Sequence, residues 1–357
     1  MSRIISFLIF FLIFLFIYGG MHYYAFSRIS SLLKIKKTTI FYIIVLILAL
    51  SFPLMSFIER SIDGKTAAVF YTASAVWLGA IFFLFCTLLV YEIINPFAKI
   101  PDQAAGIFII ILALLLTIYS LLNALPITTK EIRISMPNLE KEIKIVQLSD
   151  IHIGTIHNSG YLKRVVEKTN SLNPDLILIT GDLVDGSGIL KEESISHLSE
   201  LNSQTFFSLG NHEQFENIDE IMRFINKTGV KVLRNELINW KNIQIIGIDN
   251  GQNLKDILKT IKINNSKPSI LMYHSSTGLK DSSEAGINLQ LSGHTHDGQI
   301  YPFNLFVMPF YPKMKGLYKY NNTNLYVSPG TGTWGPPFRL GSKNEITLIR
   351  LVPNSFS

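Results

Sequence analysis

The sequence contains a single cysteine, Cys86, among its 357 residues. With one thiol the chain can form neither an intrachain disulfide nor a zinc site built from cysteines. Charged residues are also scarce, at 16% compared with roughly 25% in ordinary soluble proteins. The deficit is concentrated in the first 125 residues, which are strongly apolar. The chain therefore divides into an apolar N-terminal part and a more ordinary C-terminal part.

Long basic tracts are also missing. The net charge is +6, but the longest lysine-rich tract is the KIKK at Lys34–Lys37. A basic balance suits nucleic acid, anionic lipid or the charges that flank membrane segments. Without a longer tract we expect no nucleic-acid binding. The sequence gives no indication of an oligomeric state.

Long uncharged stretches follow one another in the N-terminal part. Four of them lack Asp, Glu, Lys and Arg and reach the roughly 20 apolar residues that a helix needs to cross a bilayer. They are Ile4–Phe26, Thr39–Ile58, Thr66–Tyr91 and Gln103–Leu125. Four such stretches in series, with no small-residue cleavage site after the first, favour a retained anchor over a cleaved signal sequence. We predict an α-helical transmembrane region of four spans over residues 1–126, embedded in the bilayer of the cell membrane.

The positive charges in the connections bear on orientation. The connection after the first predicted span carries Arg28, Lys34, Lys36 and Lys37 and no acidic residue. Positively charged connections tend to remain in the cytoplasm. Four spans would then place the C-terminal part outside the cytoplasm. Other basic residues, such as Arg60, would also lie outside, and they count against this orientation.

From about Ile127 short apolar runs alternate with amphipathic stretches, the pattern of βα units. Strands are predicted at Ile143–Leu148, Asp175–Thr180, Thr205–Leu209, Gln244–Ile248, Ser269–Tyr273 and Asn288–Leu291. Helices are predicted at Gly160–Leu172, Glu192–Leu201 and Ile218–Lys227. Two further strands, Leu325–Ser328 and Glu345–Leu351, are expected to close a second sheet. Residues 127–357 are thus predicted to form an α/β domain.

Polar side chains follow the ends of these predicted strands. In chain order they are Asp150, His152, Asp182, Asn211, His212, His274, His294 and His296. Ligands of open α/β sheets bind at the carboxyl ends of the strands, so we expect these side chains to meet. Five of the eight histidines of the chain fall in this set, which chance alone would rarely produce.

Mixed carboxylate and imidazole groups suit divalent ions such as Mn²⁺, Fe²⁺ and Zn²⁺. One ion could be held by Asp150, His152 and His296. A second could be held by Asn211, His274 and His294, with the Asp182 carboxylate bridging the two. Two ions about 3.5–4 Å apart can polarise a phosphoryl group and generate hydroxide from a bridging water at neutral pH.

The remaining polar residues near these motifs receive supporting roles. His212 could reach the substrate and protonate the leaving oxygen or stabilise the transition state. Asp185 and Glu213 are expected to orient imidazoles. His22, His157 and His197 are expected to be bystanders, although His157 is close enough to the motifs that it could contact substrate.

The ordered motifs DIH (150–152), GDLVD (181–185), GNHE (210–213), His274 and GHTH (293–296) resemble those of the calcineurin-like metallophosphoesterase superfamily, over about Ile143 to Leu351. The tail from Leu325 is similar to a bacterial branch that includes membrane-associated phosphodiesterases acting on UDP-2,3-diacylglucosamine. With its apolar N-terminal part, the chain also resembles transmembrane proteins with a metallophosphoesterase domain.

This resemblance implies a four-layer α/β/β/α sandwich. It assigns one metal to Asp150, His152, Asp182 and His296. It assigns the other to Asp182, Asn211, His274 and His294, with His212 as the catalytic histidine. One departure is Asp297, where many relatives in this branch have glycine; it removes no ligand but could alter metal or substrate preference.

The expected activity is hydrolysis of a phosphodiester or pyrophosphate bond by a metal-bridging hydroxide, with two divalent ions, manganese in preference to iron or zinc. The apolar segment Tyr301–Pro312, which contains three prolines, is expected to be a loop and could receive the acyl part of a lipid-linked substrate or simply pack over the sheet edge. A broad phosphatase acting on phosphoproteins or small metabolites is an alternative. A non-catalytic metal-dependent membrane scaffold is a third reading, which the complete set of ligands disfavours.

Overall fold

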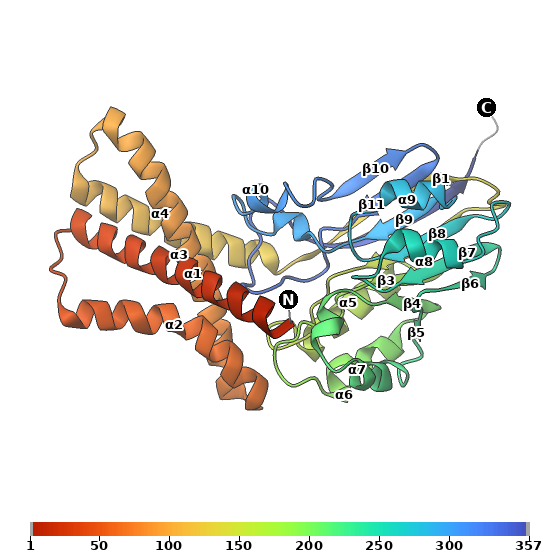
Figure 1. The fold of residues 1–357 in the computed structure, drawn as a ribbon, viewed down its shortest axis with the longest axis horizontal. Helices are drawn as coiled ribbons and strands as arrows, with labels where there is room; N and C mark the ends of the chain where they lie inside the picture. The colour runs from red at the N-terminus through yellow and green to blue at the C-terminus, as the bar shows by residue number, and fades with distance from the viewer. Residues whose placement is uncertain (1–2, 355–357) are drawn as a thin grey trace. The chain divides into compact units, whose positions relative to one another are not determined.

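The computed structural model describes residues 3–354, which fall into two compact units. The first unit comprises the chain up to Leu122 together with Gly335–Phe338. The second comprises Asn123–Trp334 and the chain from Arg339 onward. Figure 1 shows helices in the first unit and strands with covering helices in the second.

The first unit is built from long helices. They are α1 (Arg3–Leu32), α2 (Thr39–Ser61), α3 (Lys65–Ala98) and α4 (Asp102–Ala124). Among the described residues that could be searched, α2, α3 and α4 are long and apolar enough to cross a membrane. Three membrane-spanning helices are therefore supported, and the predicted fourth span over Ile4–Phe26 in α1 stays a prediction.

Several polar side chains within the helical unit have polar partners. His22 is fully buried, its Nδ1 lies 2.8 Å from the Tyr18 carbonyl oxygen, and its Nε2 accepts a hydrogen bond of 2.9 Å from Trp77. Arg28 and Glu92 form an ion pair at 2.5 Å. Polar groups within a membrane are costly unless they find such partners. His22 thus has a structural role, in agreement with its prediction as a bystander.

The second unit contains two six-stranded sheets. The first sheet has the order β1 (Ile127–Met136), β12 (Asn344–Pro353), β2 (Ile143–Leu148), β3 (Leu176–Thr180), β4 (Thr205–Ser208) and β5 (Lys231–Val232). The second has the order β10 (Gly316–Tyr320), β11 (Thr323–Val327), β9 (Leu289–Ser292), β8 (Ser269–Tyr273), β7 (Ile243–Ile248) and β6 (Glu236–Trp240). Strands β2 to β5 are parallel, as are β7, β8, β9 and β11.

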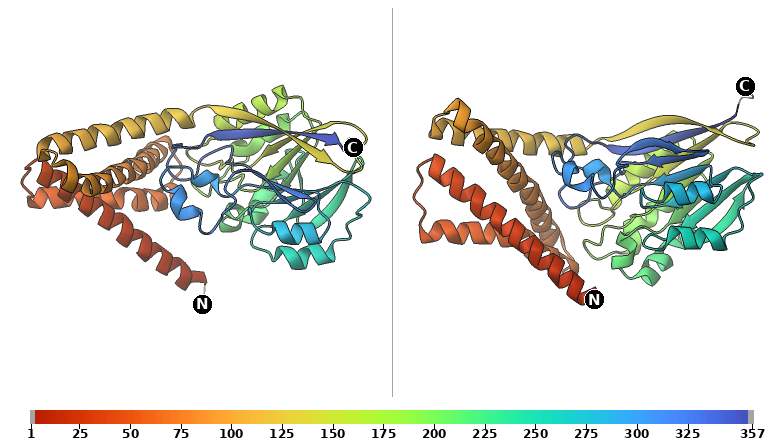
Figure 2. Two further views of the ribbon diagram at one scale, coloured as in Figure 1. Left: turned by 90° about the horizontal axis from the view of Figure 1, so that it is seen from above. Right: turned by 45° about the horizontal axis from the view of Figure 1, so that its top comes forward.

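Short helices complete the second unit. The α-helices are α5 (Ser159–Ser171), α6 (Glu192–Ile195), α7 (Ile218–Ile225), α8 (Leu254–Thr260), α9 (Leu279–Glu284) and α10 (Asn304–Val307). The 3₁₀ helices are η1 (Ser196–Glu200), η2 (His212–Phe215) and η3 (His296–Gly298). Helices α5 to α7 pack on the first sheet and α8 and α9 on the second, which Figures 1 and 2 also show.

The alternation of side chains along the strands produces this layering. In β3, Ile177 and Ile179 pack in the cluster that contains the α5 and α7 side chains. Leu176 and Leu178 point the other way and pack with Ile245 and other side chains of the second sheet. The layers therefore run helices, sheet, sheet, helices, and each central strand is buried on both faces.

The predicted elements of the α/β domain mostly agree with the structure within a few residues. The prediction that Glu345–Leu351 closes the second sheet is wrong, because β12 lies in the first sheet between β1 and β2. A strand that is buried over most of its length carries no alternation that identifies its sheet. The helix predicted over Glu192–Leu201 is the single turn α6 followed by η1.

Candidate metal centre

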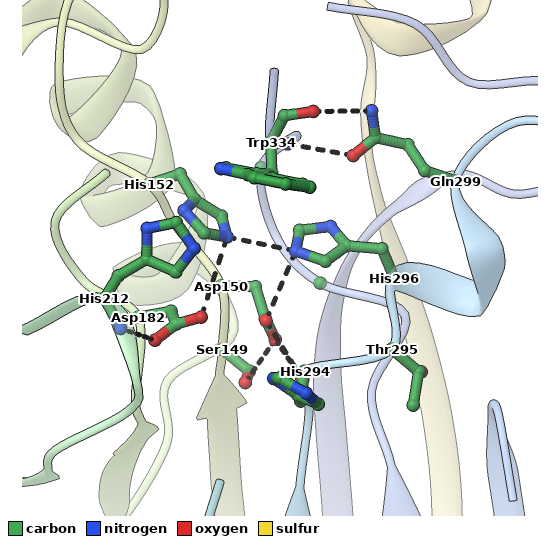
Figure 3. A network of polar contacts seen from close by, with 12 residues as sticks. Ser149, Asp150, His152, Asp182, His212, His294, Thr295, His296, Gln299 and Trp334 are labelled. Carbon is green, nitrogen blue, oxygen red and sulfur yellow. Dashed lines mark hydrogen bonds and ion pairs between the residues drawn. The ribbon is translucent and has the colours of Figure 1, made fainter. Parts of the chain in front are cut away.

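The carboxyl ends of five parallel strands carry the predicted site residues. Strands β2, β3 and β4 of the first sheet lead to Asp150 and His152, to Asp182 and to Asn211 and His212. Strands β8 and β9 of the second sheet lead to His274 and to His294 and His296. The two sheets thus contribute opposite halves of one site, which Figure 3 shows.

Several of these residues have a left-handed backbone. The φ angles are 52° at Asp150, 54° at His152, 52° at Asp182, 72° at His294 and 50° at His296. Such conformations cost roughly 1–3 kcal/mol for a residue with a side chain. Neighbouring backbone groups hold them in place: Asp150 N donates to the Gly181 carbonyl and His152 N to the Asp182 carbonyl, each at 3.1 Å. The turns therefore store strain in order to aim the side chains inward.

Asp150, His152 and His296 form the first cluster of potential metal ligands. The Nε2 atoms of His152 and His296 are 3.0 Å apart, and His296 Nε2 is 3.3 Å from Asp150 Oδ1. All three side chains are buried. Two imidazole nitrogens and a carboxylate oxygen that converge in this way fit one divalent ion.

Asp182, His274 and His294 form the second cluster. His274 Nε2 lies 3.0 Å from Asp182 Oδ2, while its Nδ1 lies 2.8 Å from the Thr180 carbonyl oxygen. That carbonyl fixes the tautomer and leaves Nε2 to face the cluster. The same Asp182 Oδ2 lies 4.0 Å from His152 Nε2 of the first cluster. Asp182 thus stands between the two clusters, as expected for a bridging carboxylate.

Buried atoms without hydrogen bonds give an independent test of this fit. Among the described residues, Asn211 Oδ1 and His296 Nδ1 are buried and have no hydrogen-bond partner. A buried polar atom left unpaired typically costs 1–3 kcal/mol. Asn211 Oδ1 belongs to the predicted ligand set, and a coordinated ion would remove that cost. The residues present therefore fit a metal centre.

The electrostatics of the site point the same way. Asp150 and Asp182 are almost completely buried. Burial alone would raise the pKa of each carboxyl, but His296 and His274 near Asp150, and His274 near Asp182, hold both pKa values well below the usual range. Burial opposes charge on His274, yet the two carboxylates raise its pKa well above the ordinary value. Two buried negative charges thus create a strong demand for positive charge.

His212 lies beside both clusters and, like Asn211 and His294, is half-buried. Its Nδ1 is 2.7 Å from the Asp185 carbonyl oxygen, and its ring stands edge-on to His152 with centroids 4.6 Å apart. Burial and the neighbouring His152 lower its pKa. His212, His152 and Asp185 also converge closely enough to hold an ion. The division between ligands and a catalytic His212 therefore stays a prediction.

The carboxylates of Asp185 and Glu213 bind different kinds of group. Asp185 Oδ1 is 3.3 Å from His152 Nδ1, so it orients an imidazole as predicted. The same prediction is wrong for Glu213, which accepts from the backbone N–H groups of Asp182, Leu183, Val184 and Gly210 at 2.7–3.1 Å. Glu213 is the second residue of η2, and its carboxylate faces the strand ends, which its place in the motif does not reveal.

Glycine is required where the turns touch the carboxylates. A Cβ atom on Gly210 would lie 2.1 Å from Asp182 Oδ1, and one on Gly293 would lie 2.1 Å from Asp150 Oδ2. Real Cβ atoms do not approach other atoms so closely. Close approach of backbone to a site is a usual reason for glycine, and here it is the Asp150 and Asp182 side chains that need the space.

Arg339 lies beside the first cluster and was not among the residues predicted to form the site. It is fully buried, and its Nη1 donates to the His296 carbonyl at 2.8 Å. Its other donors reach the Pro329 and Gly332 carbonyls, Ser342 Oγ and Asn344 Oδ1. Burial lowers its pKa to about 10, so the guanidinium stays charged at neutral pH. In the sequence, the only indication that Arg339 could be buried is its position between the apolar residues Phe338 and Leu340.

The remaining histidines and Asp297 have partners of their own. His157 Nε2 accepts from Thr333 N at 2.8 Å, so it supports backbone, and burial lowers its pKa to about 3. His197 pairs with Glu200 at 2.7 Å on the surface. Asp297 is paired with Lys315. The predicted bystanders thus bind protein groups, and Asp297 lies outside the two clusters.

The apolar segment Tyr301–Pro312 is exposed beside this site. It contains α10 and, as expected, is not a strand. Phe306 is 66% exposed and Phe310 is 76% exposed. Tyr311 Oη lies 2.9 Å from His294 Nε2. The segment therefore reaches a potential metal ligand at one end and presents aromatic rings to solvent at the other.

Metal binding should release protons, because the raised pKa of His274 keeps this imidazole protonated in the metal-free site. A ligand must lose its proton to bind, so Mn²⁺ affinity should increase with pH, by up to about tenfold per pH unit for each proton released. Calorimetry in buffers of different ionisation enthalpy would count the protons. The His274→Gln variant should lose this proton release and His197→Gln should keep it; release that survives in His274→Gln would contradict the assignment.

The Arg339→Met variant should weaken Mn²⁺ binding by about 10- to 100-fold, the usual cost of removing a group that orients a ligand. The His296 carbonyl and the turn at Gly332 would lose a charged donor. Equilibrium dialysis with metal analysis would measure affinity, and thermal unfolding would report stability. Arg350→Met removes an exposed arginine that pairs with Glu131 and Glu142, and should leave metal affinity unchanged. Equal affinities in the two variants would show that Arg339 does not position the site.

The sequence of the chain is similar to those of known proteins. The sequence profile of the calcineurin-like phosphoesterase family matches residues 143–298. An uncharacterized metallophosphoesterase of Campylobacter jejuni is 31% identical, with 97% of this chain and 98% of that protein aligned. One of Helicobacter pylori is 37% identical over 63% of this chain, which spans 64% of that protein's length. A transmembrane protein with metallophosphoesterase domain from Danio rerio is 28% identical over 87% of this chain and 79% of that protein.

The similarity to the Campylobacter protein extends through the helical unit as well as the sheets. The family profile covers the strand ends from Asp150 to His296, which the structure brings together. The chain therefore belongs to the calcineurin-like metallophosphoesterase family and is a metal-dependent phosphoric ester hydrolase.

Proposed function

We propose that this protein uses two divalent ions, manganese in preference to iron or zinc, to hydrolyse a phosphodiester or pyrophosphate bond in a lipid-linked substrate. The observation that carries the proposal is the pair of ligand clusters joined at Asp182, whose Oδ2 lies 3.0 Å from His274 Nε2 and 4.0 Å from His152 Nε2. A single-ion site would leave one cluster of buried, charged groups unexplained.

The ligand assignment follows the two clusters. Asp150, His152 and His296 would hold one ion. Asn211, His274 and His294 would hold the other, with Asp182 between them. When bound, two such ions polarise a phosphoryl group and lower the pKa of water. The protein contributes rigid placement of the carboxylates and imidazoles in a buried site.

His212 is proposed to move the proton of the reaction. Its Nδ1 faces the Asp185 carbonyl at 2.7 Å. If Nδ1 carries the proton that this carbonyl accepts, Nε2 is the ring nitrogen that would exchange a proton with the substrate. The backbone N–H of His212 donates to Asp182 Oδ1 at 2.9 Å, which ties the position of this residue to the proposed bridge. Such a group could protonate the leaving oxygen.

The apolar segment Tyr301–Pro312 supports a lipid-linked substrate. Contiguous exposed apolar surface usually marks a binding region. Tyr301, Phe303, Leu305, Phe306, Met308 and Phe310 are all exposed. The contact between Tyr311 and His294 joins this surface to the site. An acyl chain on the segment would therefore place its phosphoryl group near the two clusters.

The membrane helices fit the same proposal. Helices α2, α3 and α4 can each cross a bilayer, and a membrane protein meets lipid-linked substrates within the plane of the membrane. The basic residues Arg28, Lys34, Lys36 and Lys37 favour a cytoplasmic first connection. With four spans the catalytic unit would face the extracytoplasmic side.

Turnover of bis-p-nitrophenyl phosphate by the purified chain in detergent with Mn²⁺ tests the hydrolase and its residues. Asp182→Asn should lose nearly all activity, because the bridge between the clusters is lost. His212→Asn should keep its metals but lower kcat about 10²- to 10⁴-fold, the usual contribution of a positioned acid or base. Metal content and initial rates give the two readouts.

Two exposed residues provide matched controls: Asp256→Asn on α8 and His197→Asn on η1 should retain full activity. Loss of metals from His212→Asn would make His212 a ligand. A folded, metal-loaded wild type that hydrolyses no ester would favour the scaffold reading. Efficient hydrolysis of small phosphate monoesters or phosphopeptides, without preference for lipid, would favour the broad phosphatase.

The double variant Phe306→Ser, Phe310→Ser should raise KM for a lipid-linked phosphodiester by about tenfold, since each aromatic ring loses apolar contact with the acyl chain. Hydrolysis of bis-p-nitrophenyl phosphate should not change. Tyr320→Ser, on β10 outside the segment, serves as the control for loss of an exposed ring. An equal loss on the lipid and the soluble ester would exclude an acyl-binding role.

A further inference from the structure

The segment Pro329–Trp334 passes beside the metal clusters and is held at almost every residue. Thr331 N and Gly332 N donate to the Ser149 and Asp150 carbonyls at 2.7 and 2.8 Å. Tyr161 Oη donates to the Thr331 carbonyl, and Arg339 donates to the carbonyls of Pro329 and Gly332. His157 accepts from Thr333 N. Three side chains and two backbone carbonyls therefore hold this segment.

The last residue of this segment, Trp334, forms hydrogen bonds to the Gln299 side chain through both its backbone N–H and its backbone carbonyl. Gln299 Oε1 accepts from Trp334 N at 2.8 Å, and Gln299 Nε2 donates to the Trp334 carbonyl at 2.9 Å. Gln299 is buried and lies three residues after His296. These hydrogen bonds therefore connect Trp334 to the segment that carries a potential metal ligand. The backbone of Trp334 therefore has a fixed position relative to His296.

The side chain of Trp334 is nevertheless 54% exposed. Its ring lies edge-on to His212, with centroids 5.8 Å apart and an angle of 74° between the planes. Figure 3 shows the indole beside the rings of His152, His212 and His296. A half-exposed aromatic ring on backbone that is fixed by hydrogen bonds does not serve the hydrophobic core. Because this backbone is fixed in advance, a ligand can bind the ring without first ordering this part of the chain.

We propose that Trp334 forms a subsite for an aromatic ring carried by the phosphoester, on the side of the phosphoryl group that faces His212. This inference rests on the proposed function, because it places the phosphoryl group on the two metal clusters. Aromatic rings stack on an exposed indole with offset or edge-on geometry. An acyl chain needs a longer apolar surface, which the segment Tyr301–Pro312 offers separately. The site would thus hold an aryl or nucleobase group and an apolar chain in different places.

Binding of phosphonates to the full Mn²⁺-loaded chain in detergent tests this subsite without turnover. Phenylphosphonate, cyclohexylphosphonate and methylphosphonate share the metal-binding group and differ in the substituent. Calorimetry should show that the wild type binds phenylphosphonate about tenfold or more tightly than methylphosphonate, the scale of stacking on one aromatic side chain. Cyclohexylphosphonate, which has similar bulk but no aromatic face, should bind more weakly than phenylphosphonate.

Three variants distinguish stacking from general apolar contact. Trp334→Leu should lose the preference for phenylphosphonate and retain methylphosphonate binding within about twofold, while Trp334→Phe should keep most of the preference. Trp240→Leu removes an indole from β6 and should behave as wild type. Equal Mn²⁺ content and thermal midpoints would show that the variants are folded.

The inference is overturned if the wild type shows no aryl preference, if Trp334→Leu retains it, or if cyclohexylphosphonate binds as tightly as phenylphosphonate. These outcomes are separate from the proposed function. If the protein hydrolyses lipid-linked esters but shows no aryl preference, the Trp334 subsite is excluded and the proposed function is not. A protein with Trp334-dependent aryl binding but no turnover would retain the subsite and lose the proposed hydrolysis.

Discussion

The burial of two carboxylates is the constraint on which the catalytic unit depends. Asp150 and Asp182 lie at the ends of neighbouring strands and are almost wholly removed from water. An ionised carboxylate in such a place is costly unless positive charge or hydrogen-bond donors surround it. His274 Nε2 lies 3.0 Å from Asp182 and 3.8 Å from Asp150. The imidazoles from the second sheet offset this negative charge in part, and bound divalent metal would offset the rest.

The same constraint explains the supports around the site. Left-handed turns at Asp150 and Asp182 aim both side chains inward. Glu213 holds the turn at Asp182 through four backbone N–H groups, and Arg339 holds the His296 carbonyl and the turn at Gly332. Glu213 is acidic and accepts hydrogen bonds from backbone N–H groups, while Arg339 is basic and donates hydrogen bonds to backbone carbonyls. Buried charges thus fix backbone that would otherwise relax out of its strained conformation.

The potential metal ligands and the proposed substrate-binding groups lie on different parts of the chain. Potential ligands come from the ends of buried strands, where packing of the two sheets limits their movement. Groups that could select a substrate come from connecting segments: the exposed rings of Tyr301–Pro312 and the indole of Trp334. Tyr311 and Gln299 attach these segments to the metal clusters. If these segments bind substrate as proposed, changes in them could alter substrate preference without changing a potential metal ligand.

The sequence by itself determined the composition of the site and most of its frame. Apolar runs located strands such as β2 and β8 at their observed bounds, and the motifs after them supplied Asp150, Asp182 and His274. These features are local, so the sequence displays them. Only the tertiary structure decided that β12 joins the first sheet, that Glu213 binds backbone, and that Arg339 and Trp334 lie at the centre. Those features depend on contacts between residues far apart in the chain, and a strand or loop that is apolar on every side carries no pattern that names its partner.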